Sequence, residues 1–147
     1  MNKFELHNEY KDIDNKYNEI ADGYVENKKS KFYSYIFNIN NWSIQQIKDK
    51  IEEVKKDNKK AKHVLFAYEV IIDNIKYFKF NNDSEPQGTG MNSIISMIDK
   101  ENVTNYLVII VRYYGGILLG SGPLLRTYLS CFKEAYIKCN KKTTLFK

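Results

Sequence analysis

The side chains with the clearest chemical potential lie in two segments that are rich in glycine and proline. Six of the seven glycines and both prolines fall in the stretch from Pro86 to Pro123. Glycine reaches positive φ angles and permits close backbone contacts, whereas proline fixes φ, so these residues gather where a chain must adopt a special shape. We expect residues 83–90 and residues 112–123 to form two walls of one site.

The first segment supplies two carboxylates. Asp83 and Glu85 lie just before a proline, and carboxylates on a rigid loop can coordinate a cation or act as general bases. Neither has a second carboxylate or a histidine at a recognisable ligand spacing. This favours a structural role, in which they cap a helix that begins near Gly90 or pair with Arg112. A lone histidine such as His63 is more often a hydrogen-bonded structural residue than a catalyst.

Arginine is rare in this chain, which makes its two occurrences informative. Arg112 and Arg126 bracket the glycine-rich segment, whereas the other 21 cationic residues are lysine. Lysine can replace arginine where only a solvated charge is needed, but not where a planar guanidinium binds a carboxylate or phosphate with two parallel bonds. Each arginine therefore serves either a binding site or a structural salt bridge. We expect Arg112 to pair with Asp83 or Glu85.

The second segment follows a predicted strand and leads into a predicted helix. This arrangement presents unpaired N–H groups and the positive end of a helix dipole to an anion. Near Pro123, we expect these N–H groups either to bind an anion or to be capped by Ser121. The apolar residues 117–119 do not suit a phosphate cradle and would instead contact the core or a partner. Anion binding, partner contact and a purely structural role are all open for this segment.

The candidate site is therefore a binding site. No serine or cysteine lies in a recognisable nucleophile motif, so we predict no catalytic residue, no metal ligand and no cofactor. The candidate binding residues are His63, Asp83, Glu85, Arg112, Tyr113, Gly115, Gly116, Leu119, Gly120, Ser121, Gly122 and Arg126.

Length and composition indicate one domain with an asymmetric charge. The 147 residues can bury one sizeable core. Cys131 and Cys139 lack disulfide-framework and metal-ligand spacing, so we interpret them as core thiols in a reducing compartment. No apolar run is long enough to span a membrane, and we expect a cytoplasmic protein. Residues 1–27 carry three lysines against seven acidic residues, a net charge of −4, which leaves +9 elsewhere. The basic body suits nucleic acid or acidic protein surfaces.

Hydrophobic spacing predicts the elements that position the two segments. Apolar residues recur every three or four positions in residues 1–27, which predicts a helical extension. These residues are Tyr10, Ile13, Tyr17, Ile20 and Tyr24. The elements predicted after it are a strand over 32–39, a helix that begins at Ser43 with a capping box to Gln46, a hairpin over 63–72 and 75–80, a short helix over 91–98, a strand over 106–111 that is buried on both faces, and a last helix that begins at Pro123.

Together these elements predict an α+β fold, namely a single mixed β-sheet with helices packed on one face. We expect an acidic extension over residues 1–27, a folded domain over residues 28–140 and a basic tail over residues 141–147. The extension either covers the basic surface and moderates access to a partner or completes the core.

Several motifs together resemble the IMPACT/YigZ family. They are residues 29–32 (KSKF), the strand over 63–68, residues 83–86 (DSEP) with Gly88 and Thr89, and residues 111–120 (VRYYGGILLG) with Gly122 and Arg126. The resemblance covers about residues 28–139 and implies a fold similar to the second domain of ribosomal protein S5. Bacterial relatives usually carry a further ferredoxin-like domain, and longer eukaryotic relatives carry an RWD domain. We expect neither within these 147 residues.

The resemblance also implies a role in translation control. Eukaryotic relatives restrain a stress kinase that phosphorylates an initiation factor, by competing for the ribosome-associated activator of that kinase. The leading hypothesis is therefore a non-enzymatic regulator of translation and the stress response that binds a translation-associated protein. The alternative is direct binding to RNA or the ribosome, which the basic body favours. A third reading is a hydrolase that uses Glu85, His63 and Arg112 around an anionic substrate.

Overall fold

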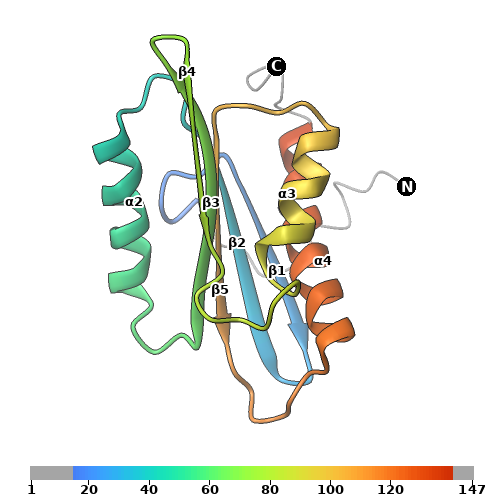
Figure 1. Ribbon diagram of the computed structural model, residues 1–147. Helices are drawn as coiled ribbons and strands as arrows, with labels where there is room; N and C mark the ends of the chain where they lie inside the picture. The colour runs from blue at the N-terminus through green and yellow to red at the C-terminus, as the bar shows by residue number, and fades with distance from the viewer. Residues whose placement is uncertain (1–14, 141–147) are drawn as a thin grey trace.

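The computed structural model describes residues 15–140, which form one five-stranded sheet and three helices (Figure 1). The elements are β1 (Ala21–Asn27), β2 (Ser30–Asn38), α2 (Ile44–Asp57), β3 (His63–Ile72), β4 (Ile75–Asn81), α3 (Met91–Lys100), β5 (Tyr106–Tyr113) and α4 (Ser121–Asn140). The strands and helices predicted after residue 28 are all present, with bounds shifted by no more than two residues. None of the described helices is long and apolar enough to cross a membrane.

The sheet is antiparallel throughout, with the strand order β1-β2-β5-β3-β4. The predicted α+β class and the single sheet are confirmed, whereas the prediction of a mixed sheet is wrong. The connection through α2 does return β3 parallel to β2. However, β5 lies between these two strands and runs antiparallel to both. This long-range pairing leaves no trace in the local sequence pattern.

Helices cover both faces of the sheet, so the prediction that they pack on one face is wrong (Figure 1). On one face, Ile47, Ile51 and Val54 of α2 pack against the sheet, and α3 and α4 pack against the other face. The physical reason lies in β5, in which residues 106–112 are all buried. Neighbouring side chains of a strand point to opposite faces, so an apolar strand of this kind needs cover on both.

The segment before residue 28 belongs to the sheet, so the predicted helix is wrong wherever the structure describes it. Ala21–Asn27 is β1, which pairs with β2 along its whole length. Lys28 and Lys29 join the two strands with φ angles of 47° and 67°, the left-handed geometry of a tight hairpin turn. The turn and the pairing outweigh a helical spacing of only a few residues. Tyr10 and Ile13 lie outside the described residues.

Two local signals are read correctly from the sequence. The Ser43 side chain accepts a hydrogen bond from the Gln46 N–H at 3.1 Å, and the Gln46 side chain accepts one from the Ser43 N–H at 2.7 Å. This is the predicted capping box at the start of α2. Asp73 and Asn74 form the turn between β3 and β4 with φ angles of 52° and 64°. Both signals depend on a few adjacent residues, which explains their reliability.

The last helix begins earlier than predicted. α4 begins at Ser121, so Pro123 is its third residue rather than its first. Proline is still tolerated there, because the N–H groups of a first helical turn have no partner within the helix. Cys131 and Cys139 are buried cysteines outside any disulfide of the described residues, as predicted, and burial raises the pKa of Cys131 to about 12. The buried residues of α4 are Leu124, Thr127, Tyr128, Cys131, Phe132, Ala135, Tyr136 and Cys139.

Candidate functional site

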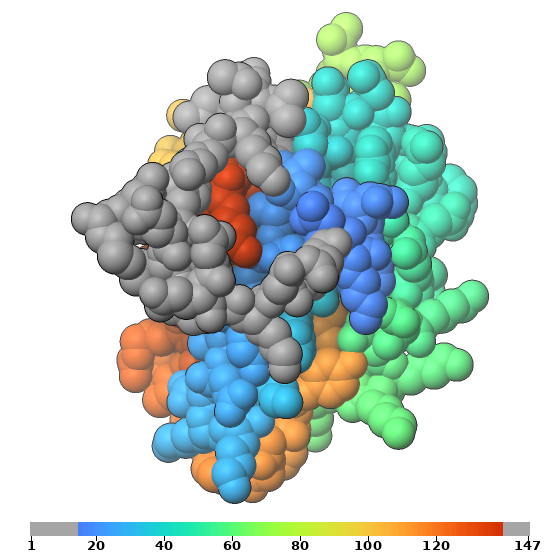
Figure 2. All heavy atoms as spheres, turned by 180° about the vertical axis from the view of Figure 1, so that it is seen from behind, coloured from blue at the N-terminus to red at the C-terminus, as the bar shows by residue number. Residues whose placement is uncertain are grey.

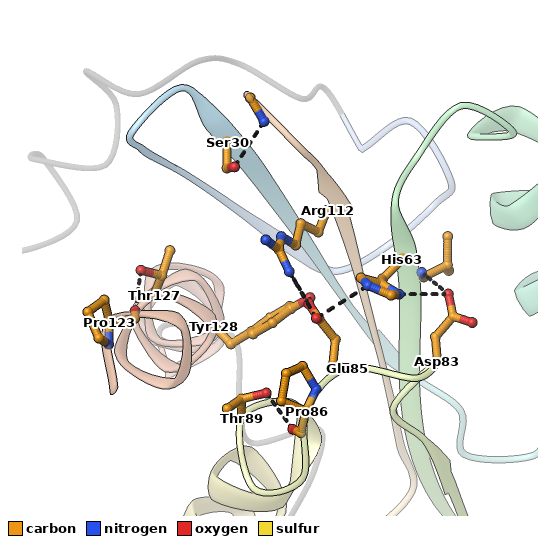
Figure 3. A network of polar contacts seen from close by, with 12 residues as sticks. Ser30, His63, Asp83, Glu85, Pro86, Thr89, Arg112, Pro123, Thr127 and Tyr128 are labelled. Atoms are coloured by element: carbon orange, nitrogen blue, oxygen red, sulfur yellow. Dashed lines mark hydrogen bonds and ion pairs between the residues drawn. The ribbon is translucent and has the colours of Figure 1, made fainter. Parts of the chain in front are cut away.

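Four elements bring a buried cluster together near the end of the molecule that carries the loops after β5 and α2 (Figure 1). The sheet register pairs Arg112, near the end of β5, with His63 at the start of β3. The loop between β4 and α3 contributes Glu85, and α4 contributes Tyr128. Figure 3 shows these four side chains pointing toward one another. We call His63, Glu85, Arg112 and Tyr128 the Glu85 cluster.

The Glu85 carboxylate is the centre of this cluster. Arg112 Nη1 lies 2.7 Å from Glu85 Oε2 and 2.9 Å from Oε1. The Tyr128 hydroxyl donates to Oε2, and His63 Nε2 lies 3.3 Å from Oε1. Of the two predicted partners of Arg112, Glu85 is therefore the one that forms the pair. This pair differs from a two-nitrogen fork because one nitrogen contacts both oxygens, and within the described structure the buried Arg112 Nε has no hydrogen-bond partner.

Asp83 takes a different role from Glu85. Its Oδ2 accepts a hydrogen bond from the Val64 N–H at 2.7 Å and lies 3.7 Å from His63 Nδ1, so it does not pair with Arg112. Neither carboxylate caps α3. The Asn82 side chain does so instead, since its Oδ1 accepts from the Met91 N–H at 2.7 Å. Asparagine is a favoured capping residue, but its distance of nine residues from Met91 hides this role in the sequence.

The electrostatics of the cluster favour a structural carboxylate over a catalytic one. The Glu85 side chain is only 1% exposed, and its oxygens face the donors of Arg112 and Tyr128 and the imidazole ring of His63. Burial, followed by the charge of Glu85, raises the pKa of Tyr128, so the hydroxyl stays a donor. A carboxylate enclosed in this way has no open side for a substrate. The cluster ties β3, β5, α4 and the β4–α3 loop together.

The glycine pair after β5 allows a close backbone contact. A Cβ atom on Gly115 would lie 2.1 Å from the Lys29 carbonyl carbon, far inside van der Waals contact. The Gly115 N–H donates to the Ser30 side chain at 3.0 Å, and Gly116 has a φ of 92°. Glycine suits both positions for steric reasons. The loop between β5 and α4 is thus held against the β1–β2 turn.

Beyond these glycines the loop presents apolar side chains to solvent. Tyr114 is 42% exposed, Ile117 is 44% exposed and Leu118 is 80% exposed. Leu119, a predicted binding residue, is partly buried and packs against the core below α3 and α4. We call Tyr114, Ile117 and Leu118 the loop tip. Its anchored base and exposed apolar side chains fit the partner-contact reading of this segment.

The remaining candidates lie outside the Glu85 cluster. The Tyr113 hydroxyl donates to Asn58 Oδ1 at 2.6 Å, which ties β5 to the end of α2. Ser121 is the first residue of α4 and so does not cap it, and the Leu124 N–H donates to the Gly120 carbonyl at 2.9 Å. Arg126 is exposed and forms no ion pair within residues 15–140. It borders a surface hollow of about 310 Å³, formed by α4 and residues 25–27.

The same end of the molecule collects lysines. Figure 2 shows the β1–β2 turn in light blue beside the β5–α4 loop in orange, and the Lys62 N–H donates to the Arg112 carbonyl next to the α2–β3 loop. We call the exposed lysines of the β1–β2 turn, of the start of β2 and of the segment between α2 and β3 the lysine end. They are Lys28, Lys29, Lys31, Lys59, Lys60 and Lys62. Within residues 15–140, no group of histidine, cysteine and acidic side chains could hold a metal ion.

An antiparallel α+β domain with this cluster and loop matches a known family. Residues 28–136 match the model of the Impact N-terminal domain, and the chain belongs to the IMPACT family. It is 33% identical over 101 residues to the IMPACT family member YvyE of Bacillus subtilis, and 31% identical over 104 residues to YigZ of Escherichia coli. These matches cover 69% and 70% of this chain but 45% and 50% of the relatives. The chain thus spans about half the length of the curated relatives it matches.

Two solved structures share the fold. A crystal structure of a hypothetical protein has a TM-score of 0.66 and 29% identity, and the match covers 79% of this chain and 57% of that one. The two-domain translational regulator Yih1 has a TM-score of 0.52 and 20% identity over 78% of this chain and 45% of its own. The predicted family and the α+β fold are therefore confirmed.

Proposed function

We propose that this chain regulates translation, without catalysing a reaction, by binding a translation-associated protein through the loop tip. Membership of the IMPACT family supports the link to translation, because the family's fold also occurs in a protein described as a translational regulator. A cytoplasmic location and a role in the stress response are parts of this proposal.

The exposure of the loop tip is the observation that carries the proposal. Leu118 is 80% exposed, the largest value among the exposed apolar side chains of the described residues. The hydrogen bond from Gly115 to Ser30 and the tight contact with Lys29 hold the base of this loop. Exposed apolar side chains on a loop whose base is held in place can bind a partner with little loss of conformational entropy. The enclosed Glu85 carboxylate gives no comparable support to a hydrolase.

A second candidate function is direct binding to RNA or the ribosome. The lysine end supports it, because it gathers six exposed lysines, and Lys31 lies opposite the half-buried Tyr113, whose ring contacts that of Tyr33. Lysines can contact phosphates, and tyrosine rings can stack on bases. Such binding would weaken steeply as the salt concentration rises, whereas an apolar protein contact would change little.

A crosslinking experiment distinguishes these two functions. A photoreactive amino acid replaces Leu118, and the protein is irradiated in an extract of its own cells with and without nuclease. The proposal predicts crosslinks to one translation factor or ribosome-associated protein that persist after nuclease treatment. A matched control places the same photoreactive group at Lys56, an exposed position on α2. Crosslinks to RNA alone, or equal protein crosslinks from position 56, would contradict the proposal.

A further inference from the structure

The outer strand β4 is an exposed edge with an apolar surface. It is the last strand in the sheet order, and all seven of its residues are exposed. Figure 1 looks onto this edge, and no described helix or strand crosses in front of it. Tyr77, Phe78 and Phe80 are 40%, 45% and 40% exposed. Long exposed apolar edges invite pairing with a further strand.

The register identifies the backbone groups that such a strand would meet. A two-residue turn makes Ile72 and Ile75 a hydrogen-bonded pair, and hydrogen-bonded and non-hydrogen-bonded pairs alternate from there along β3 and β4. Lys76, Phe78 and Phe80 therefore turn their N–H and C=O groups away from β3. Ile71, which lies opposite Lys76 on β3, likewise turns its backbone groups away from its partner strand. Its N–H donates to Asn105 Oδ1 at 2.9 Å rather than to β4.

We propose that β4 pairs with β4 of a second copy of this chain, so that two five-stranded sheets join into one. The residue types support an antiparallel pair centred on Phe78. In this register Phe78 lies opposite Phe78 of the second copy, Lys76 opposite Phe80, and Tyr77 opposite Lys79. Each lysine then meets an aromatic ring, a favourable cation–π contact, and no two like charges face each other.

Registers shifted toward the end of β4 and pairing with an acidic strand are less favourable. Moving the register by one residue toward the end of β4 breaks the match of outward backbone groups. Moving it by two residues toward the end of β4 centres the contact on Lys79. Lys79 of one copy then lies opposite Lys79 of the other, and the two like charges repel. An acidic strand from another protein would neutralise the lysines, but its charged side chains would not cover the exposed rings of Tyr77, Phe78 and Phe80. The proposal concerns the edge opposite β1 in the sheet and stands independently of the loop tip.

Sedimentation of the full chain tests the dimer. The average mass should rise from monomer toward dimer as the concentration passes through about 10–100 µM, the weak range expected for a small interface. Phe78→Glu places two carboxylates opposite each other at the centre and should weaken the dimer at least tenfold. Phe78 is exposed, so the variant should keep its fold, which circular dichroism checks. Leu118→Glu changes an exposed apolar residue of the β5–α4 loop rather than of β4, so it should leave the dimer unchanged.

Paired cysteines test the register. In the proposed pair, Tyr77 and Lys79 of the two copies are directly opposite and not hydrogen-bonded, the spacing that accepts a disulfide. Tyr77→Cys/Lys79→Cys should form a crosslinked dimer on mild oxidation, whereas Tyr77→Cys/Asn81→Cys should not. The native cysteines are buried and do not compete. A chain that stays monomeric at 1 mM, a dimer that Phe78→Glu leaves intact, or equal crosslinking of both cysteine pairs would overturn the proposal.

Discussion

Glu85 shows how one buried carboxylate can organise a fold at the scale of single residues. It accepts hydrogen bonds from Arg112 on β5 and Tyr128 on α4, and the ring of His63 on β3 lies 3.3 Å from its Oε1. A buried carboxylate is stable only when it is paired and hydrogen-bonded, so each donor is needed. The Arg112 guanidinium also lies over the Phe32 ring, 5.7 Å from its centre. Arginine suits this position because it combines the ion pair with a planar contact.

Replacing Arg112 with lysine should therefore destabilise the protein. Lysine has one compact ammonium group, which cannot keep both the contact with the two Glu85 oxygens and the contact with Phe32. We expect Arg112→Lys to lower the free energy of unfolding by about 1–3 kcal/mol, measured by urea denaturation. Arg126→Lys is the matched control, because Arg126 is exposed and should change stability by less than about 0.5 kcal/mol. Equal effects from the two substitutions would refute a structural role for the cluster.

A second buried carboxyl group makes stability depend on pH. Glu19 is 3% exposed, and its Oε1 accepts a hydrogen bond from the Tyr17 N–H at 2.8 Å. Burial, followed by the neighbouring Asp22 carboxyl, raises the pKa of Glu19 from 4.5 to about 7. The folded protein therefore holds this proton more tightly than the unfolded chain does. The stabilisation is complete below pH 4.5 and is lost as the pH rises through 7.

Glu19→Gln should remove this dependence while keeping the shape of the side chain. Relative to the variant, the wild type should lose about 2–3 kcal/mol of unfolding free energy as the pH rises from about 5 to about 8. Urea denaturation at several pH values measures the difference. The exposed Glu52→Gln serves as the control and should follow the wild type. Parallel pH profiles for the wild type and Glu19→Gln would show that Glu19 titrates normally.

At the scale of single residues, the sequence predicts a contact when one of its residues is of a type that is rare in the chain. The rarity of arginine is enough to predict that Arg112 pairs with Asp83 or Glu85, and the structure shows the pair with Glu85. Tyr128 is missed, although it lies among the buried residues of α4. A tyrosine four residues before Phe132 was the available signal. Its role depends on the rotation of the helix, which local spacing does not determine.

At the scale of elements, the contact between two loops depends on Gly115. Any side chain there would collide with the Lys29 backbone, because the nearest atom lies 2.1 Å from the position of a Cβ. We expect Gly115→Ala to separate the β5–α4 loop from the β1–β2 turn and to weaken the bond to Ser30. The free energy of unfolding should fall by about 2 kcal/mol or more, measured by thermal and urea denaturation.

Gly120→Ala provides a control within the same loop. A Cβ on Gly120 would meet only Pro123 Cδ at 3.6 Å, an ordinary contact. This substitution should change stability by less than about 0.5 kcal/mol. If Gly115→Ala proves as mild as Gly120→Ala, the close backbone contact is not needed for the fold.

The elements themselves follow from local sequence wherever the signal is local. The capping box at Ser43 and the turn at Asp73 and Asn74 depend on a few adjacent residues, and both are read correctly. β1 is misread as a helix because its place in the sheet comes from pairing with β2. The position of β5 between β2 and β3 is likewise a long-range choice. The nearly all-apolar β5 did contain the clue that both faces of the sheet are covered.

At the scale of the whole molecule, the division of charge suggests a test of the N-terminal extension. The structure shows that a truncation must end before Tyr17, because Tyr17 is buried and donates a hydrogen bond to Asp57. A chain that lacks residues 1–14 loses a net charge of −2. If the extension moderates access to the basic surface, this chain should bind single-stranded RNA more tightly at low salt.

The salt dependence provides the control for this truncation. The difference between the two chains should shrink as salt screens both surfaces. Fluorescence anisotropy at about 50 and about 200 mM salt measures both affinities. A folded, truncated chain that binds RNA no better than the full chain would exclude an inhibitory role for residues 1–14.

We propose that the loop tip connects this IMPACT family domain to translation. The most direct measurement is the yield of a reporter in a translation extract of the protein's own cells as the purified chain is added. The wild type should shift the yield in a dose-dependent way, and Ile117→Ser/Leu118→Ser should need at least tenfold more protein for the same shift. Ile71→Ser, which changes an exposed apolar residue on β3, should behave as the wild type. A wild type without effect, or a loop-tip variant of equal potency, would contradict the account.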